Sequence, residues 1–331
     1  MAVTTFVTGG TGFLGRHLVP ALCRAGHHIR VLARDPDAHV WLRQYPDLEI
    51  VRGDVTDASC LRDAARGCDY VVHAAGYFRF WGEQAQFDAT NVAGTENVLR
   101  AARDAKRIIH ISTVALIGTP DGIVDEQHPV NPSDNYQRSK YKAEQTALRL
   151  HAEQGAPVVV LRPGAFYGPL GTYAFNRLFF KDPMRGIIMQ INGGSYVTFP
   201  VYVADVAQAI LRAFEFGRTG ETYNVSGESL THKAAFDIIC REANLWYPRL
   251  NIPGWLGVSF ARVLTVLADA VRHEPFYPVT LRSYVYNYWR VSSDKAKREL
   301  GFVPTPFAEG ARRTIAWYRA GQPDHIAEVE C

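Results

Sequence analysis

The fold is decided by the stretch TGGTGFLG, residues 8–15, in which four glycines stand between a short apolar run and a longer helical pattern. The run Thr4–Thr8 has the β-branched and aromatic residues of a strand, and Leu14–Ala25 has the apolar spacing of a helix. Glycines let the backbone turn tightly, and the start of a helix presents free amide hydrogens and the positive end of its dipole. The stretch therefore predicts a strand–turn–helix unit that binds the pyrophosphate of a dinucleotide.

Strands and helices continue to alternate through the first half of the chain. Helical patterns such as Ala58–Arg66 and Asn91–Asp104 separate runs that are rich in Val and Ile. The further candidate strands are Ile29–Ala33, Glu49–Arg52, Tyr70–Ala74, Ile108–Ser112 and Val158–Leu161. This alternation predicts right-handed βαβ units and an α/β fold, a doubly wound parallel sheet of the Rossmann type with helices on both faces.

The texture of the sequence changes after residue 164, where Gly and aromatic residues become frequent. We predict a dinucleotide-binding domain over residues 1–164 and a smaller, mostly helical substrate-binding lobe over residues 165–331. Strand-like runs at Val197–Val203 and Thr222–Val225 lead us to expect that residues 197–225 return to the main sheet. The two units are therefore interleaved, and the lobe is expected to close over the carboxyl edge of the sheet, where ligands bind in such folds.

Composition excludes several classes of protein. The net charge is +3 and no run of Lys and Arg occurs, which argues against a nucleic-acid partner. The five cysteines are scattered and odd in number, as expected of reduced thiols in a cytoplasmic protein. No cluster of histidines has the spacing of a metal site, and no signal peptide opens the chain.

The longest apolar stretch is Trp255–Val271, which Arg262 and Asp269 interrupt, so it predicts no integral membrane segment. Its apolar residues recur at helical spacing; they are Phe260, Val263, Leu264, Leu267 and Val271, with Arg262, Thr265, Asp269 and Arg272 on the other side. We expect a lobe helix that covers the core or the pocket. A helix lying on a membrane surface is the alternative.

The end of the second strand indicates which dinucleotide is used. A guanidinium at Arg34 suits the 2′-phosphate of NADP(H), whereas a solvated Arg34 with Asp35 on the ribose would suit NAD(H). After the third strand, Asp54 and Val55 are expected near the adenine, although Asp54 could equally cap the next helix. After the fourth strand, the small residues 74–76 let the backbone approach the cofactor.

The candidate catalytic pair is Tyr136 and Lys140, which stand four residues apart and hence on one face of a helix. A tyrosine titrates near pH ~10, and a nearby ammonium lowers that pKa toward the range useful for acid–base catalysis. Because Tyr141 and Lys142 are adjacent, spacing alone leaves the choice open. Thr113 follows the fifth strand, where its hydroxyl can hold a substrate carbonyl against Tyr136 or simply cap the loop.

Taken in order, the motifs resemble those of the extended short-chain dehydrogenases/reductases, the NAD-dependent epimerase/dehydratase superfamily. They are TGGTGFLG at 8–15, HAA at 73–75, NVAGT at 91–95, Ser112-Thr113, YQRSK at 136–140, LRPGAFYGP at 161–169, YVADV at 202–206, KAKRELGF at 295–302 and Trp317-Tyr318. The likeness spans nearly the whole chain, and such an ordered set of motifs is specific.

The resemblance implies that Tyr136 exchanges a proton with the substrate oxygen while the nicotinamide exchanges hydride, and that Lys140 holds the nicotinamide ribose. The implied catalytic residues are Thr113, Tyr136 and Lys140. The implied cofactor-binding residues are Gly9, Thr11, Gly12, Phe13, Leu14, Gly15, Arg34, Asp54, Val55, Ala74, Ala75, Gly76, Asn91, Ser112, Tyr136, Lys140, Pro163 and Gly164. Family members often form dimers, so the resemblance also implies a homodimer through Asn91–Asp104 and Tyr136–His151.

The substrate is indicated by what surrounds these motifs. Sugar-nucleotide enzymes of this family commonly carry an Arg about where Thr198 stands, although Arg177 or Arg185 could substitute for it. Aromatic residues crowd the expected pocket loops; they are Tyr77, Phe78, Phe80, Trp81, Phe166, Tyr173, Phe175 and Phe199. We expect Tyr77, Trp81, Thr113, Phe166 and Phe175 to contact the substrate.

The Arg34-Asp35-Pro36 sequence and the C-terminal lobe resemble the dihydroflavonol reductase and 3β-hydroxysteroid dehydrogenase branch, whereas the loop at 77–81 resembles hopanoid-associated members classed as sugar epimerases. We therefore predict an NADP(H)-dependent oxidoreductase acting on a ketone or secondary alcohol of a lipophilic small molecule. A nucleotide-sugar epimerase or dehydratase with tightly bound cofactor is the alternative, and a non-catalytic cofactor-sensing protein is the third.

Overall fold

The computed structural model describes residues 3–246, 248–271, 280 and 282–324, with only the secondary structure of 267–271 and 282. Within these residues seven parallel strands form one sheet in the order β12-β7-β5-β4-β1-β2-β3. The strands are β1 (Thr4–Thr8), β2 (His28–Ala33), β3 (Leu48–Arg52), β4 (Tyr70–His73), β5 (Arg107–Ile111), β7 (Val158–Pro163) and β12 (Thr222–Val225). The strand order reverses between β1 and β4, which places the expected ligand site outside the carboxyl ends of these two strands.

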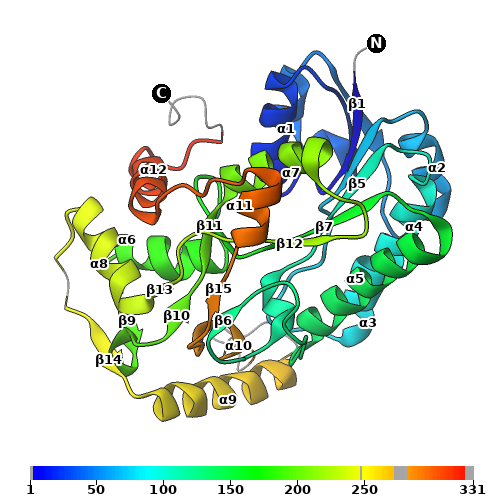
Figure 1. Ribbon diagram of the computed structural model, residues 1–331. Helices are drawn as coiled ribbons and strands as arrows, with labels where there is room; N and C mark the ends of the chain where they lie inside the picture. Colours follow the sequence, from blue (N-terminus) through cyan, green and yellow to red (C-terminus); the bar gives the residue numbers. More distant parts are fainter. Residues whose placement is uncertain (1–2, 247, 272–279, 281, 325–331) are drawn as a thin grey trace.

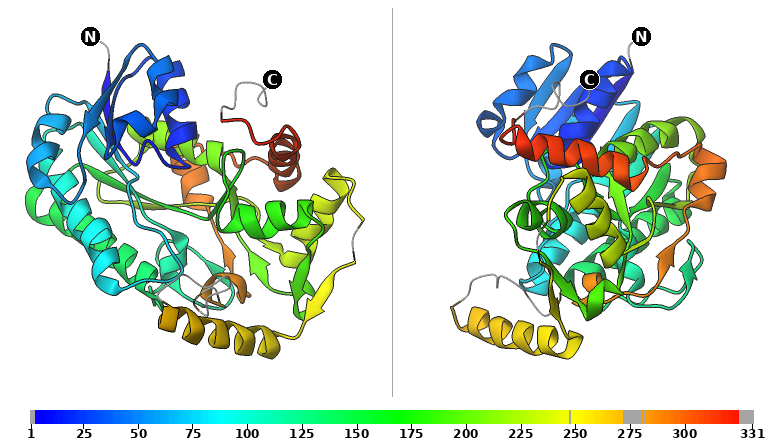
Figure 2. Two further views of the ribbon diagram at one scale, coloured as in Figure 1. Left: turned by 180° about the vertical axis from the view of Figure 1, so that it is seen from behind. Right: turned by 90° about the vertical axis from the view of Figure 1, so that its left-hand side faces the viewer.

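Helices cover both faces of the sheet, as the strict alternation predicts (Figures 1 and 2). On one face lie α1 (Gly15–Arg24), α7 (Val203–Phe216) and α11 (Asp294–Leu300). On the other face lie α2 (Ala58–Ala65), α4 (Gly94–Ala101) and α5 (Asn135–Gln154). A short helix α3 (Gln84–Phe87) and a π-helical turn over Asp88–Ala93 lead into α4, so the predicted helix from Asn91 begins earlier and ends at Ala101.

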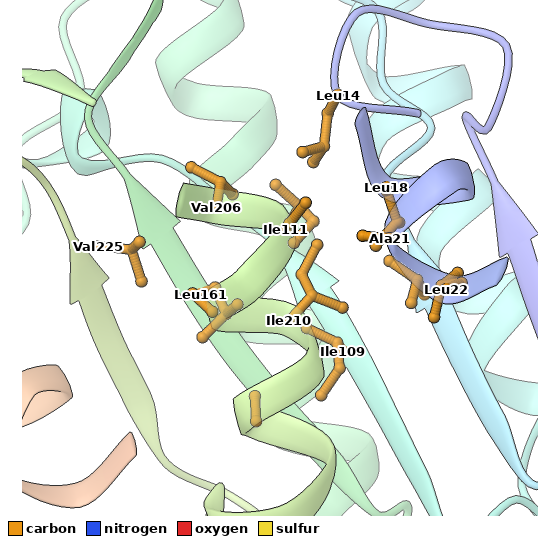
Figure 3. Close-up of a cluster of buried hydrophobic side chains, with 14 of the residues drawn as sticks. Leu14, Leu18, Ala21, Leu22, Ile109, Ile111, Leu161, Val206, Ile210 and Val225 are labelled. Carbon is orange, nitrogen blue, oxygen red and sulfur yellow. The ribbon is translucent and has the colours of Figure 1, made fainter. Parts of the chain in front are cut away.

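The core beneath the first face is drawn in Figure 3. Leu18 and Leu22 of α1 and Ile210 of α7 meet Ile109 of β5 and Leu161 of β7, and all five are fully buried. The strand residues between them, among which Ile108 and Val160 are examples, pack in the core of the opposite face. Because both faces are covered, these strands read as continuous apolar runs rather than as alternating ones.

The lobe is built from short strand pairs and helices. The pairs are β8 (Ala165–Tyr167) with β11 (Pro200–Tyr202), β9 (Met189–Ile191) with β14 (Leu250–Ile252), and β10 (Val197–Thr198) with β13 (Leu230–Thr231). A fourth pair joins β15 (Arg290–Val291) to β6 (Ile123–Val124), which comes from the first half of the chain. The helices of the lobe are α6 (Asp182–Met184), α8 (His232–Glu242), α9 (Gly254–Val271), α10 (Arg282–Val285) and α12 (Phe307–Arg319). Aromatic rings fill its core, for example Tyr167, Phe180 and Phe307.

The predicted strand Val197–Val203 differs from the structure. It breaks at Phe199 into β10 and β11, and neither half joins the main sheet. The Phe199 carbonyl accepts a hydrogen bond from the amide of Ala165 (3.0 Å), while proline at 200 has no amide hydrogen with which to continue a ladder. The chain returns to the main domain only from α7 onward, and β12 then forms the edge of the sheet.

The expected lobe helix forms as α9, but its apolar residues do not cover the core. Phe260 and Val263 are 59% and 58% exposed. The face turned to the protein carries the small residues Gly254, Gly257 and Ala261, which are buried. A Cβ at Gly257 would come within 2.7 Å of the Tyr286 hydroxyl, so close packing selects small residues there.

Some parts of these predictions fall outside the described residues. They are the side chains of Leu267, Asp269 and Val271, together with Arg272 and Cys331. Among the described residues, no helix is long and apolar enough to cross a membrane, and no group of three or more His, Cys, Asp or Glu side chains could hold a metal ion.

Candidate active site

The glycine-rich loop between β1 and α1 owes its shape to close backbone contacts. Gly9 has a φ of +74°, and a Cβ there would lie 2.6 Å from the carbonyl carbon of Ala74. A Cβ at Gly15 would lie 2.1 Å from the carbonyl oxygen of Gly10. The amide of Gly12 donates to the Gly9 carbonyl (3.1 Å), which closes the turn. Glycine at these positions thus brings the loop against the end of β4.

The first turn of α1 is left without a capping side chain. Leu14 occupies the position before the helix, and its side chain is buried in the core (Figure 3). Thr11, Gly12 and Phe13 lie exposed or partly exposed in the loop before it. An uncapped helix start behind a glycine loop offers backbone amides and a positive dipole end to an anion. These residues fit a pyrophosphate, which the Leu14 side chain, buried in the core, would not contact.

At the end of β2, Arg34 extends into solvent with its side chain 84% exposed, and its Nε lies 4.0 Å from the Asp54 carboxylate. Asp54 Oδ1 accepts hydrogen bonds from the amide and hydroxyl of Thr56, both at 2.8 Å. Asp57, rather than Asp54, caps α2. Asp35 accepts from the amide of Asp37 (3.2 Å) and so caps a short 3-10 turn. Arg34 is therefore an exposed cation at the edge where the adenosine would lie.

Val55 and Asn91 hold the structure around this site. Val55 is buried against Gly94, where an added Cβ would lie 2.8 Å from its methyl group. Asn91 is buried, accepts from the amide of Tyr77 (2.7 Å) and donates to the Ser139 hydroxyl (2.8 Å). Asn91 thus ties the loop after β4 to helix α5, a positioning role that the predicted cofactor contact did not anticipate.

Tyr136, Lys140 and Thr113 meet at the carboxyl end of β5. Asp134 caps α5 through the amide of Gln137 (2.8 Å), which sets Tyr136 in the first turn of the helix. The side chain of Thr113 lies beside the Tyr136 hydroxyl, where its hydrogen-bonding group lowers the pKa of that phenol. Thr113 also accepts from the amide of residue 115 (3.2 Å), so it caps the loop as well. The loop-capping interpretation of Thr113 therefore describes this side chain, and the substrate contact stays a prediction.

The electrostatics of the pair differ from the simple expectation. Burial, followed by the charge of Asp134, raises the pKa of Tyr136, and the hydrogen bond from Thr113 opposes this. Burial lowers the pKa of Lys140 to about 8, against the opposing charge of Glu144. The Lys140 ammonium donates to the carbonyl of Ile111 (2.6 Å). Tyr136 is therefore a protonated phenol at neutral pH, suited to donate a proton.

The nicotinamide end of the expected site also contains an unsatisfied polar group. The Ser112 hydroxyl is buried, and within the described part of the chain it has no hydrogen-bond partner. Such a group normally has a partner, and a ligand hydroxyl or amide would provide one. Pro163 ends β7, and a Cβ at Gly164 would lie 2.3 Å from the carbonyl oxygen of Phe199. Packing against the lobe thus explains Gly164, and Ser112 favours a bound dinucleotide.

Aromatic rings gather around Tyr136. Phe78 lies 4.7 Å from the Tyr136 ring between centroids, and Phe80 lies 5.1 Å from Phe78. Tyr173 and Tyr284 extend this cluster, at 5.6 Å and 5.2 Å from Phe80. We call these four rings, Phe78, Phe80, Tyr173 and Tyr284, the aromatic cluster. Its members come from the loop after β4, from the loop after β8 and from α10.

The predicted substrate contacts coincide with this cluster only in part. Tyr77 packs against Phe87, itself 6.5 Å from the Tyr136 ring, and Trp81 is partly buried. Phe166 packs edge-on to Phe13 of the glycine-rich loop (6.4 Å).

The predicted substrate contact of Phe175 is wrong. This side chain is buried in the lobe core, where its ring stacks on Phe179 at 4.2 Å, because the lobe needs large apolar side chains inside. Phe78, Phe80 and Tyr173 are among the aromatic residues expected in the pocket loops, although they are not among the expected substrate contacts. Nothing in the sequence links Tyr284 to Tyr136.

Comparison with known proteins supplies the family. The family model described as "NAD dependent epimerase/dehydratase family" matches residues 5–226. A "4-hydroxy-2-methyl-3-oxo-4-farnesyl-3,4-dihydroquinoline-1-oxide ketoreductase" of Stigmatella aurantiaca is 34% identical, over 90% of this chain and 91% of that protein. A "dTDP-glucose 4,6-dehydratase" of Streptomyces niveus is 31% identical, over 95% of this chain and 92% of that protein.

The fold has close structural counterparts as well. The crystal structure of a protein designated gox2253 superposes with a TM-score of 0.80 and 29% identity, over 96% of this chain and 98% of that one. The family model, the relatives above 30% identity and the shared fold agree with one another. The chain therefore belongs to the NAD-dependent epimerase/dehydratase family, the extended short-chain dehydrogenases/reductases.

Proposed function

We propose that this protein is an NADP(H)-dependent oxidoreductase that interconverts a ketone and a secondary alcohol on a lipophilic, ring-bearing or isoprenoid-like small molecule. The observation that carries the proposal is the placement of Tyr136 beside Thr113 and against the Phe78 ring of the aromatic cluster. A proton donor set among rings suits a carbonyl on an apolar body.

A nicotinamide bound in this site would supply the hydride of the proposed reaction. Thr113 and Tyr136 hold the carbonyl oxygen by hydrogen bonds, and the Tyr136 hydroxyl gives that oxygen a proton as it becomes an alcohol. Lys140 would hold the nicotinamide ribose, and its ammonium would stabilise the phenolate that Tyr136 becomes when it gives up its proton. A proton from solvent then restores Tyr136, so one ketone, one NADPH and one proton give one alcohol and one NADP⁺.

The surroundings favour a lipophilic substrate over a nucleotide sugar. Thr198 is buried in the strand pair β10–β13, where a diphosphate would need a cation. Of the two candidate replacements, Arg177 is paired with Asp182 (3.8 Å). Among the relatives, the one at 34% identity is named a ketoreductase, and its named substrate carries a farnesyl chain.

One observation favours the alternative, a nucleotide-sugar epimerase or dehydratase. Arg79 is an exposed cation whose guanidinium lies 5.7 Å from the centre of the Tyr173 ring, in the aromatic cluster. A diphosphate could be bound there. The relative at 31% identity is named a dTDP-glucose dehydratase, in line with this alternative.

The test follows NADPH absorbance while the purified protein is offered cyclic ketones and isoprenoid ketones. Oxidation of NADPH with formation of the matching alcohol supports the proposal. If the ketones leave NADPH unchanged, while dTDP- or UDP-sugars are epimerised or dehydrated without net loss of cofactor, the alternative replaces it. Binding of NADPH with turnover of neither panel would favour the cofactor-sensing protein.

Arg34 should determine the choice of cofactor. Arg34→Ala is expected to weaken NADPH binding by about 10- to 100-fold, because a charge-assisted bond to the 2′-phosphate contributes about 1.5–3 kcal/mol. NADH, which lacks that phosphate, should bind within about twofold of the wild type. Fluorescence titration with both nucleotides measures this, with Arg43→Ala as a control from the same exposed surface. Equal losses for NADPH and NADH, or none for either, would assign the adenosine site to other residues.

Lys140 should make NADPH binding depend on pH. The protonated ammonium is the form that donates to the ribose, and its pKa is about 8 in the free protein. Affinity should be full below that pH and fall above it, by at most about tenfold per pH unit. Titrations between about pH 7 and pH 9.5 check this, with Lys140→Arg as the control, because a guanidinium stays charged throughout. A flat profile in the wild type would show that Lys140 does not hold the cofactor.

A further inference from the structure

Helix α9 presents an apolar face to the outside of the molecule. In Figures 1 and 2 it runs along the outer edge of the lobe, apart from the other helices. Its exposed large side chains are Trp255, Leu256, Phe260, Val263 and Val266, and we call these five the α9 face. Trp255 and Val266 are 72% and 70% exposed. An apolar patch of this kind marks a site of contact with a protein or a membrane.

Helix α9 exposes its large apolar residues to solvent and buries its small ones, which is the reverse of an ordinary amphipathic surface helix. The five residues follow one another at helical spacing and share one side of α9, while Gly254, Gly257 and Ala261 fill the buried side. An ordinary surface helix directs its large apolar residues inward. In α9 the small residues pack against the lobe, and the large apolar residues stay exposed, where another surface can contact them.

The polar groups of α9 argue for lipid as the occupant. The hydroxyl of Ser259 donates to the Trp255 carbonyl (2.9 Å), and that of Thr265 donates to the Ala261 carbonyl (2.8 Å). Among the described side chains of α9, Arg262 is the one charged group. Protein interfaces carry about one hydrogen bond per 100–200 Å², and this face offers few groups to make them. A bilayer surface requires none.

Helix α9 also carries an amphipathic aromatic ring and a cationic side chain, the two kinds of side chain expected at a bilayer surface. The ring of Trp255 is amphipathic and suits the boundary between headgroups and acyl chains. The long side chain of Arg262, which is exposed, can reach a headgroup while its stem stays in the apolar layer. Since no described helix is fit to cross a membrane, contact would be along the surface.

The start of helix α9 is connected to the aromatic cluster through the segment that holds Tyr284 and Tyr286. The Tyr286 hydroxyl donates to the carbonyl of Gly254, at the start of α9 (3.5 Å). Two residues earlier, Tyr284 packs on Phe80 of the aromatic cluster (5.2 Å). A helix resting on a bilayer would therefore hold the cluster, and Tyr136 behind it, close to the lipid.

We propose that the α9 face docks on the surface of a lipid bilayer and that the substrate reaches the aromatic cluster from that bilayer. The second part rests on the proposed function, because only a lipophilic substrate would be dissolved there. The first part does not depend on turnover.

Docking is tested by sedimentation with vesicles of phosphatidylcholine, with and without phosphatidylglycerol. The full chain should bind both, and binding should persist at high salt because most of the contact is apolar. Trp255→Ser/Phe260→Ser should lower the partition coefficient at least about tenfold, since two large apolar side chains lose their burial. Val303→Ser, at an exposed apolar residue outside α9, should leave it unchanged.

The double variant should keep its thermal unfolding midpoint, because the residues it changes are exposed. Three results would each overturn the docking. They are a wild type that binds neither kind of vesicle, a double variant that binds as strongly as the wild type, and binding that is lost at high salt. If the wild type is a dimer that the double variant separates, and vesicles bind neither protein, the α9 face is an interface between two copies and the proposal is wrong.

The delivery step has a separate readout. Reduction of a ketone held in vesicles should be faster for the wild type than for the double variant, while a short, water-soluble ketone should be reduced equally by both. Ketone reduction without vesicle binding would remove this inference and leave the proposed function standing. Vesicle binding without reduction of any ketone would keep the docking and remove the delivery step together with the proposed function.

Discussion

Replacing Tyr136 by Phe is expected to lower kcat for ketone reduction by about a thousandfold, within the range of about 10²–10⁴ that general acid–base catalysis contributes. The substitution removes the hydroxyl that would protonate the substrate oxygen and keeps the ring that packs on Phe78 at 4.7 Å. The affinity for NADPH should stay within about twofold of the wild type, because the fold and the glycine-rich loop are unchanged.

The measurement is NADPH consumption under substrate saturation, beside a binding titration of NADPH alone. Tyr141→Phe is the matched control, because Tyr141 is the neighbouring tyrosine and packs in the small core around Trp289. It should keep at least about half of the activity. Equal losses in both variants would point to helix α5 as a structural support, and an active Tyr136→Phe would remove Tyr136 as the proton donor.

Local sequence patterns predicted the strands and helices of the main domain well, because each strand there pairs with other strands of the same parallel sheet. Strand β1 occupies Thr4–Thr8 as predicted. Each end of β2 to β5 lies within one residue of its predicted position. The glycine-rich loop and the ends of β4 and β5 converge as a consequence of parallel strand order. Thr113, which the sequence places at the end of the fifth strand, therefore lies beside Tyr136.

The lobe was predicted less well, because its elements take their partners from far along the chain. The strand-like run from Val197 is divided by Pro200 between two partners, β13 and β8. For α9, helical periodicity identified Phe260 and Val263 but not the other three members of the α9 face, and it could not say which side would rest on the protein. The small residues Gly254, Gly257 and Ala261 decide that, and their significance depends on the neighbouring Tyr286.

The same limit explains the aromatic residues of the candidate site. Composition alone could not separate Phe78, which lies on Tyr136, from Phe175, which fills the lobe core. Both are large rings in loop-like sequence. Only the three-dimensional path of the loops after β4 and β8 distinguishes them.

A buried ion pair between Glu144 of α5 and Arg162 of β7 should have the largest effect on stability. The side chains are 0% and 6% exposed, and Arg162 Nε donates to Glu144 Oε2 at 3.0 Å, with a second bond from its Nη2 to Oε1. Glu144→Ala leaves the guanidinium buried without its partner, which costs about 3–5 kcal/mol of the free energy of unfolding. Chemical denaturation of the wild type and the variant measures this cost.

The matched control is Glu144→Met/Arg162→Met, which replaces both charges by side chains of similar length. Since the loss comes from an unpaired buried charge, the double variant should recover most of the stability. Equal instability of both variants would show instead that the site cannot be repacked, and the charge argument would fail.

The pair also bears on catalysis, because Glu144 lies one helical turn beyond Lys140 and its charge raises the pKa of that ammonium. Without Glu144 the pKa of Lys140 should fall below about 8. The decline of NADPH affinity with rising pH should therefore begin at lower pH in the double variant than in the wild type, even where its stability is restored. Identical profiles would confine Glu144 to a structural role; a shifted profile would make the pair a positioning device for the cofactor lysine.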